Sequence, residues 1–201
     1  MGVQKIKRSY RKTKYILYKE TLIDFKEHIW AFLGSFIGIG LIAYIQSKTL
    51  LHVDVVYLIG SFGASSVLVY GIIQSPLAQP RNLVGGHVVS AIVGVTVAKF
   101  IPDVLWITAP LAVSLSIVLM QMTKTLHPPG GATALIAIIG TPKIKNLGYW
   151  YVLYPVLSGV IILLVVALIF NNMTPNRSYP NHKKYHIIRK KLVGNIKKNL
   201  S

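Results

Sequence analysis

Six long apolar segments, separated by short polar or basic stretches, constrain what this chain can fold into. They cover residues 29–46, 55–73, 83–101, 104–122, 126–140 and 149–170. Most of them approach the ~20 residues that a helix needs to cross the hydrocarbon core of a bilayer. The chain is 53% hydrophobic and only 13% charged, which is too apolar for a soluble domain of 201 residues. The sequence therefore predicts an all-α membrane protein, a helical bundle of six hydrophobic segments.

The fifth segment begins with backbone that cannot continue a helix. Pro128 and Pro129 have no N–H group, and each disfavours helical geometry in the residue before it. Gly130 and Gly131 follow, and they allow another group to approach the main chain closely. The remaining helix, of roughly ten residues, is too short to cross a bilayer alone. It could present free N–H groups to an anion at membrane depth, or it could be a Pro-kinked packing helix, and these residues favour neither alternative.

The second and fifth segments share a local pattern. Residues 63–68 read Gly-Ala-Ser-Ser-Val-Leu and residues 131–136 read Gly-Ala-Thr-Ala-Leu-Ile, and a glycine and then Ser-Pro or Thr-Pro follow each. We therefore expect an internal 3+3 repeat, with four full spans plus two broken or re-entrant helices. If all segments cross, the halves are inverted and two broken helices meet at one central site. If the second and fifth segments re-enter, the halves are parallel. Five spans are rejected, because they would place one basic end outside.

The basic residues concentrate at the two ends of the chain. Of the 22 Lys and Arg residues, 8 precede residue 29 and 8 follow residue 170. This distribution is typical of cytoplasmic termini that contact anionic lipid headgroups, and it argues against nucleic acid as a partner. We expect a basic arm with an interfacial amphipathic helix (1–28), a transmembrane domain (29–171) and a basic cytoplasmic tail (172–201). The absence of a signal-like or transit-like segment favours a prokaryotic cytoplasmic membrane, and glycine-rich helix faces favour a homo-oligomer.

Acidic residues are scarce and lie at or beyond the ends of the apolar segments. The five are Glu20, Asp24, Glu27, Asp54 and Asp103. A cation-coupled carrier commonly buries a carboxylate inside the membrane, so this distribution favours an anion or a neutral solute. The chain has no cysteine, which excludes a thiolate metal site, and it contains no common hydrolase, metalloprotease or phosphate-binding motif. We expect no enzymatic activity, no cofactor and no metal.

The candidate binding residues lie in the glycine-rich motifs and beside them. Each histidine could donate a hydrogen bond to an anion or carry a proton with it, or it could simply tie down a loop. The hydroxyl groups could add donors or bond back to their own helices. The substrate-binding candidates are Ser61, Gly63, Ala64, Ser65, Ser66, His87, His127, Gly130, Gly131, Ala132 and Thr133. The entrance candidates are Gln79, Arg81, Asn82 and Lys124, whose structural alternatives are helix capping and contact with headgroups.

Three motifs in order carry a family resemblance. Residues 60–66 read Gly-Ser-Phe-Gly-Ala-Ser-Ser, and residues 75–82 read Ser-Pro-Leu-Ala-Gln-Pro-Arg-Asn, with Gly-Gly-His at 85–87. Residues 127–135 read His-Pro-Pro-Gly-Gly-Ala-Thr-Ala-Leu. Together they resemble the motifs of the HPP family of integral membrane proteins, over about residues 30–170. The resemblance implies a small membrane transporter, with nitrite as the substrate reported for plastid members.

Three hypotheses follow from these observations. The leading one is a transporter or channel for a small inorganic anion, bound between two half-helix starts, and nitrite enters only through the resemblance. The second is a non-transporting membrane scaffold or lipid-binding protein, whose glycines serve helix packing. The third is a membrane enzyme acting on a lipid or quinone. A polar cavity between the motifs would favour transport, whereas a fully packed centre would favour a scaffold.

Overall fold

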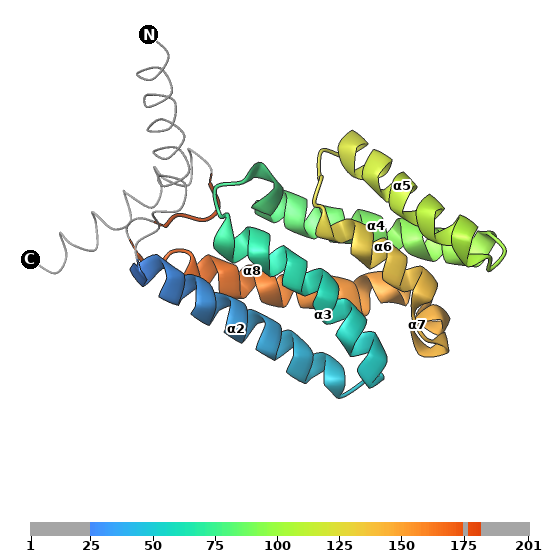
Figure 1. Ribbon diagram of the computed structural model, residues 1–201, viewed down its shortest axis with the longest axis horizontal. Helices are drawn as coiled ribbons and strands as arrows, with labels where there is room; N and C mark the ends of the chain where they lie inside the picture. The colour runs from blue at the N-terminus through green and yellow to red at the C-terminus, as the bar shows by residue number, and fades with distance from the viewer. Residues whose placement is uncertain (1–24, 175–176, 182–201) are drawn as a thin grey trace, which may run out of the picture.

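The computed structural model describes residues 25–174 and 177–181, and this part of the chain is helical without strands (Figure 1). Several helices begin at a proline, which needs no hydrogen-bond partner in the first turn. The helices, in chain order, are α2 (Phe25–Ser47), α3 (His52–Ser66) with the π-helical turn η1 (Val67–Gly71), η2 (Pro76–Ala78), α4 (Pro80–Phe100), α5 (Leu105–Met122), α6 (Pro129–Ile139), α7 (Pro142–Leu147), η3 (Val152–Leu157) and α8 (Ser158–Phe170).

The apolar segments are all helical, which confirms the predicted all-α class. Five helices are long and apolar enough to cross a membrane, and the shorter α6 completes the six segments. This division differs from the expected four full spans and two broken helices, because the second segment is continuous from His52 to Gly71. Residues 60–66 contain glycines but no proline, so the helix runs through them. The internal repeat stays a prediction.

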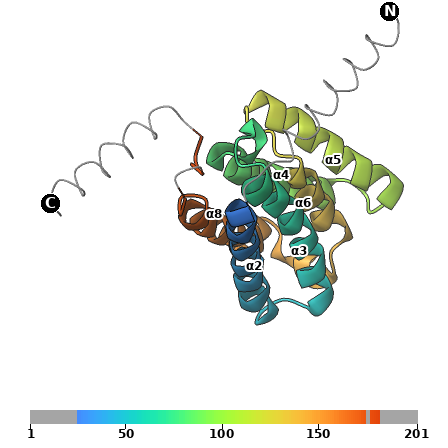
Figure 2. The same ribbon diagram turned by 60° about the vertical axis from the view of Figure 1, so that its left-hand side comes forward.

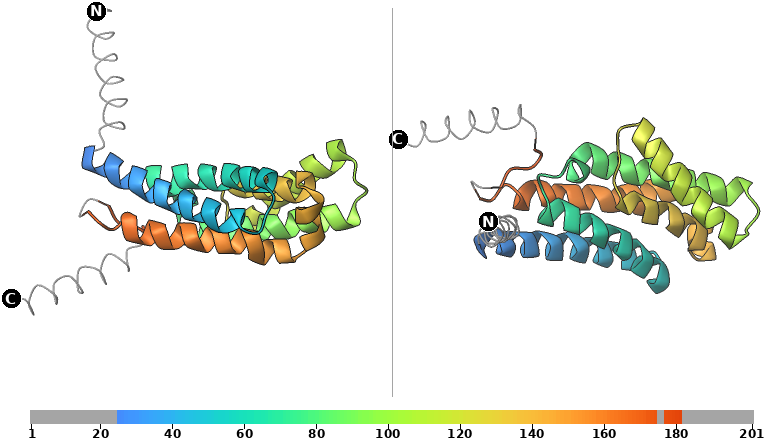
Figure 3. Two further views of the ribbon diagram at one scale, coloured as in Figure 1. Left: turned by 90° about the horizontal axis from the view of Figure 1, so that it is seen from below. Right: turned by 45° about the horizontal axis from the view of Figure 1, so that its top comes forward.

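The two described ends of the bundle lie on the same side of the molecule. Helix α2 begins and α8 ends at one end, and α7 lies at the opposite end (Figures 1 and 3). The extended residues after α5 and the short α6 together return the chain toward α7, so a short helix takes the place of a sixth span. Among the described residues five helices are of full length, and the placement of both termini on one side of the membrane stays a prediction.

Helices α4 and α6 form the centre of the bundle. Helix α4 packs mainly against α6 and α5, whereas α2 packs against α8 and α3. Helices α2 and α5 therefore lie on opposite flanks (Figure 2). The α4–α6 contact is close because Gly94 has no side chain: an added Cβ there would lie 2.4 Å from the Ala134 carbonyl oxygen. Backbone thus meets backbone at the middle of the molecule.

Helix α2 uses part of its small-residue face inside its own chain. An added Cβ at Gly34 would lie 2.7 Å from the Tyr70 ring, and one at Gly38 would lie 2.8 Å from the Tyr70 hydroxyl. Nothing lies within 4 Å of an added Cβ at Gly40. Two of the three glycines on this face therefore serve the packing of α2 against its own bundle, and self-association stays a prediction.

Candidate functional site

A cluster of buried polar side chains lies where α3, α4, α6 and the loop before α6 meet. We define the polar cluster as Ser61 and Ser65 on α3, His87 on α4, His127 in the loop, and Thr133 on α6. Each of these side chains is at most 1% exposed. Polar groups inside a membrane bundle are costly unless they are paired, so their hydrogen bonds decide what the cluster can do.

Local sequence brings these residues to one place. Ser61 and Ser65 lie four residues apart and share a face of α3. On α4, Gly86 allows the extended loop to press against the helix, since an added Cβ would lie 2.4 Å from the His127 Cβ. Asn82 fixes the same loop by donating to the Leu126 carbonyl oxygen at 2.8 Å. The Gly-Gly-His motif thus leaves room on α4 for the His-Pro-Pro loop to pack against the helix.

The hydrogen-bond partners of the two histidines determine which atom donates in each bond. The His127 Nδ1 lies 2.8 Å from the Leu77 carbonyl oxygen, which can only accept, so the neutral ring carries its proton on Nδ1. Its bare Nε2 then accepts from the Ser65 hydroxyl at 2.9 Å. Ser65 in turn accepts from His87 Nε2 at 2.8 Å. The His87 Nδ1 is left as an acceptor for the Thr133 hydroxyl at 2.7 Å.

Thr133 connects the histidines to the rest of the bundle. Its hydroxyl lies 2.9 Å from the Ser61 hydroxyl, which also lies 3.0 Å from the Pro129 carbonyl oxygen. The Tyr151 hydroxyl donates to the Thr133 carbonyl oxygen at 2.9 Å. Tyr151 is fully buried, and it was not among the candidates drawn from the sequence. The signal that could have identified it is its place between the exposed residues Trp150 and Leu153, on the inward face of the last segment.

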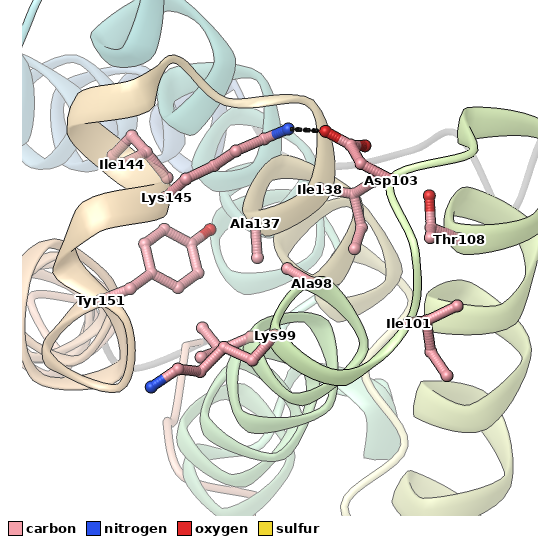
Figure 4. Close-up of a pocket in the computed structure, with 11 residues that line it drawn as sticks. Ala98, Lys99, Ile101, Asp103, Thr108, Ala137, Ile138, Ile144, Lys145 and Tyr151 are labelled. Atoms are coloured by element: carbon pink, nitrogen blue, oxygen red, sulfur yellow. Dashed lines mark hydrogen bonds and ion pairs between the residues drawn. The ribbon is translucent and has the colours of Figure 1, made fainter.

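A pocket opens at the α7 end of the bundle, with Tyr151 at its wall (Figure 4). Its volume is about 80 Å³. Lys99 from α4 and Lys145 from α7 line it, and Lys145 Nζ lies 2.9 Å from Asp103 Oδ2. Lys99 Nζ lies 5.2 Å from the centre of the Tyr149 ring. The lining therefore carries two cations and the Asp103 carboxylate, and the Tyr151 side chain connects it to the polar cluster through its hydrogen bond to the Thr133 carbonyl oxygen.

The opposite end of the bundle is closed by residues 177–181, which the sequence assigned to the tail. Arg177 donates to the carbonyl oxygens of Glu27 (3.2 Å) and Tyr70 (2.8 Å). The Tyr179 hydroxyl donates to the Ala78 carbonyl oxygen at 2.7 Å. Burial lowers the pKa of Arg177, while the Glu27 carboxylate acts in the opposite direction. Burial raises the pKa of Tyr179 above its usual value, so this phenol is a neutral donor.

The remaining binding candidates lie around the polar cluster or outside it. Ala64 is exposed, and nothing lies within 4 Å of an added Cβ at Gly63. Ser66 is 4% exposed, but its hydroxyl has no hydrogen-bond partner among the described residues. Gly130 packs against α4, with an added Cβ 2.7 Å from Ser90 Oγ. Gly131 and Ala132 are partly buried, and the nearest atom to an added Cβ at Gly131 is in Val113 of α5.

The structure corrects the expected backbone anion site. Residues 63–66 lie within α3 and do not start a helix. At the start of α6, the Gly130 N–H donates to the His127 carbonyl oxygen at 2.8 Å, and the Gly131 N–H donates to Pro128 at 3.1 Å. The two N–H groups that were expected to face an anion are therefore used inside the loop. Side chains, not helix N-termini, form the polar centre of this bundle.

The four entrance candidates lie at the end of the molecule opposite the pocket. Gln79 donates to the carbonyl oxygens of Ile73 (3.0 Å) and Ser75 (2.8 Å), and it begins α4 without a side-chain cap. Arg81 donates to the Thr123 carbonyl oxygen at 2.9 Å, at the end of α5. Asn82 holds the loop as described above, and Lys124 is exposed with a φ of 56°. Three of the four side chains thus fix backbone turns.

Two carboxylates are buried, contrary to the expectation drawn from their sequence positions. Asp54 is fully buried in the first turn of α3 and accepts from the Thr141 N–H at 3.0 Å and from its hydroxyl at 2.5 Å. Glu27 is 7% exposed and accepts from Thr174 at 2.8 Å. The expectation was wrong because a residue at the end of one apolar segment can be covered by a different segment of the chain. Neither carboxylate forms a hydrogen bond with the polar cluster.

Comparisons with known proteins agree with the membrane assignment. A family model described as the HPP transmembrane region matches residues 20–180. Two curated transmembrane proteins of Dictyostelium discoideum are 47% and 46% identical over 160 residues, which is 78% of this chain. The chain spans about half the length of these relatives, 56% and 51% respectively. No solved structure matches the chain significantly.

Proposed function

The chain belongs to the HPP transmembrane family, and from that membership we propose that it moves a small inorganic anion, with nitrite first among the candidates, across a membrane. The observation that carries the proposal is the polar cluster, where five polar side chains meet in the interior of an apolar bundle. Buried polar groups are expensive in such a bundle, and they commonly mark the path of a solute. The proposal is transport, not catalysis.

The proposed path begins at the pocket and continues through Tyr151 and Thr133. Lys99 and Lys145 would raise the local concentration of anions at the pocket. Rotation of the Tyr151 side chain would break one hydrogen bond and join the pocket to the Thr133 backbone. The hydroxyl groups and imidazoles of the polar cluster would then replace part of the ion's hydration shell. The described conformation would be the closed one.

The proposed setting is an integral membrane protein with both termini in the cytoplasm and its basic ends against anionic headgroups. The curated relatives are eukaryotic, so they lend no support to a prokaryotic cytoplasmic membrane. We expect neither nucleic acid nor a metal ion as a partner. Among the described residues, no group of three or more His, Cys, Asp or Glu side chains could hold a metal ion.

A scaffold is the second candidate, and one observation favours it. In the described conformation both imidazoles of the polar cluster bond to protein atoms on both nitrogens. Backbone contacts at Gly86 and Gly94 close the space between α4, the His127 loop and α6. A protein whose only task is to hold partners in a membrane would need no more than this packing. Solute flux separates the two candidates directly.

The test is nitrite uptake into proteoliposomes, with formate, nitrate, chloride and urea as competitors. We expect saturable uptake above that of protein-free vesicles, competition by anions, and none by urea. Thr133→Val keeps the side-chain volume and removes the hydroxyl, and it should lower uptake at least tenfold. Ser116→Ala is the matched control, because this buried hydroxyl bonds only to Ala112 of its own helix. Folded protein with no flux of any solute would favour the scaffold.

A further inference from the structure

We propose that the anion crosses together with one proton, which the two histidines of the polar cluster accept. This inference rests on the proposed transport function and adds its coupling ion. It depends on the Ser65 hydroxyl between the histidines and the Thr133 hydroxyl beside His87. Each of these hydroxyls has a second acceptor within hydrogen-bond distance.

Ser65 can release His127 without any movement of heavy atoms. Its hydroxyl donates to His127 Nε2 at 2.9 Å, and it also lies 3.2 Å from the Ser61 carbonyl oxygen. If a proton arrives on His127 Nε2, the Ser65 hydroxyl can turn to the Ser61 carbonyl oxygen. Its oxygen then accepts from both imidazole N–H groups, because a hydroxyl has two acceptor lone pairs. The protonated cluster is therefore as fully hydrogen-bonded as the neutral one.

His87 has an equivalent arrangement on its other nitrogen. Thr133 donates to His87 Nδ1 at 2.7 Å, and the Ser61 hydroxyl lies 2.9 Å from Thr133 Oγ1. Because Ser61 can donate to the Pro129 carbonyl oxygen at 3.0 Å, the Thr133 hydroxyl can turn to Ser61 and leave His87 Nδ1 free for a proton. The cluster thus offers two positions for a proton, on opposite sides of Ser65.

The cluster holds one proton, not two. The ring centres of His87 and His127 lie 5.0 Å apart, so two positive charges would repel each other strongly in this buried place. The other aromatic ring against His87 belongs to Phe62, at 5.4 Å, and it carries no charge. The hydroxyl groups of Tyr151 and Tyr179 donate to the backbone carbonyl oxygens of Thr133 and Ala78 respectively, and not to the imidazoles. One net positive charge is therefore the largest change that this centre accommodates.

In the part of the chain that the structure describes, no carboxylate is paired with that single charge. Among the described residues, the hydrogen-bonded partners of the carboxylates lie elsewhere: Asp54 with Thr141, Glu27 with Thr174, and Asp103 with Lys145. A buried imidazolium without a negative partner is unfavourable. An anion that enters beside Thr133 would supply the partner, so binding of the anion and of the proton must strengthen each other. The pair crosses without net charge.

Proteoliposomes distinguish this coupling from simple anion passage. Nitrite uptake is followed together with the internal pH, after subtraction of uptake by protein-free vesicles, in which nitrous acid leaks. In one arm a pH gradient, acidic outside, is imposed while K⁺ and valinomycin hold the potential at zero. In the other arm a K⁺ diffusion potential is imposed without a pH gradient. We expect uptake to rise severalfold with the pH gradient, and to be insensitive to the potential.

The two arms separate failure of this inference from failure of the transport function. Uptake that follows the potential and leaves the internal pH unchanged would overturn proton coupling and leave anion transport standing. No uptake in either arm would overturn both. A second measurement needs no variant: nitrite added to the purified chain in weakly buffered detergent should remove close to one proton per chain from solution. Binding without proton uptake would contradict the proposal.

Ser65→Ala tests the relay itself. The variant removes the hydroxyl that lies between the imidazoles, and we expect its residual uptake to lose the dependence on external pH. Ser116→Ala, the same change at another fully buried serine, should keep that dependence. If Ser65→Ala does not fold, proton uptake on nitrite binding to the wild-type chain still decides the question. A folded Ser65→Ala protein with the wild-type pH profile would refute the assignment of the proton to this cluster.

Discussion

The two ends of the bundle treat charge in opposite ways. Where α2 begins and α8 ends, the Arg177 and Glu27 side chains are 7% and 8% exposed, with Nε and Oε2 3.5 Å apart. At the α7 end, Lys145 and Asp103 are 37% and 72% exposed, with a shorter distance of 2.9 Å. Burial, not distance, decides which pair holds the structure, because water screens the second pair and not the first. We call the end with Arg177 and Glu27 the locked end, because its ion pair is buried. We call the end with Lys145 and Asp103 the open end, because its exposed ion pair can exchange partners.

This difference suggests that one end stabilises the fold and that the other admits the anion. Arg177 binds backbone carbonyl oxygens from α2 and from the end of η1, and it also donates to Asn171 Oδ1 at 2.6 Å. It therefore fastens three chain segments to one another. Lys145 forms its ion pair with Asp103 at the mouth of the pocket, where an incoming anion could replace the carboxylate. We therefore expect the stability of the fold to depend on the first end and the uptake of the anion on the second.

The largest expected effect is on stability, at the locked end. Arg177→Ala would leave the Glu27 carboxylate buried beside an empty space, and loss of one partner of a buried pair costs about 3–5 kcal/mol. Unfolding in detergent should show this loss. Lys145→Ala is the control from the other end, with an expected change below about 1 kcal/mol. Equal losses in the two variants would show that the ends do not differ.

The next largest effect is on uptake, at the pocket. Replacing Lys99 and Lys145 together by glutamine removes both cations that line the pocket, and the half-saturating nitrite concentration should rise about three- to tenfold. The effect should shrink at high ionic strength, because salt screens steering of the anion. Lys48→Gln is the control, since this lysine stacks on Tyr44 and does not line the pocket. An effect independent of salt would contradict steering.

A smaller effect on stability is expected from Tyr179→Phe. The change removes the hydrogen bond to the Ala78 carbonyl oxygen in a fully buried place, and it should cost about 1 kcal/mol. Tyr149→Phe is the matched control at the α7 end, where the hydroxyl lies 3.0 Å from Thr96 Oγ1 in an exposed position. Its expected cost is below about 0.5 kcal/mol. A larger loss from Tyr149→Phe would reverse the comparison.

Much of the fold could be predicted from the sequence, because apolar length and proline positions act locally. Pro80, Pro129 and Pro142 occupy first turns of helices, as local rules require. The continuity of the second segment was missed, because its resemblance to residues 131–136 outweighed the absence of a proline. Burial of Asp54 depends on Thr141, 87 residues away in sequence, and no local pattern indicates such a contact.

The candidate site, too, could be predicted only in part from the sequence. The motifs indicated His87, His127, Ser65 and Thr133, and the structure brings these four side chains together. Their role as ligands stays a prediction. The expected use of backbone N–H groups depended on how the loop folds, and the loop satisfies its own amides. The pocket was missed because Lys99 lies on α4 and Lys145 on α7, and these helices meet at one end of the bundle through the packing of α4 against α6, which leads into α7.

The smallest expected effect concerns Asp103, and it tests whether the open end truly exchanges partners. Asp103→Asn removes the negative partner of Lys145 from an exposed position, so stability should change by less than about 1 kcal/mol. Free Lys145 would then meet the anion without competition, and the half-saturating nitrite concentration should fall about twofold, in line with the modest strength of exposed pairs. Asp103→Glu keeps the charge and should behave as the wild type does. A higher half-saturating concentration in Asp103→Asn would mean that the carboxylate positions Lys145 for the anion. The pair would then be part of a preformed site, and the open end would be organised much as the locked end is.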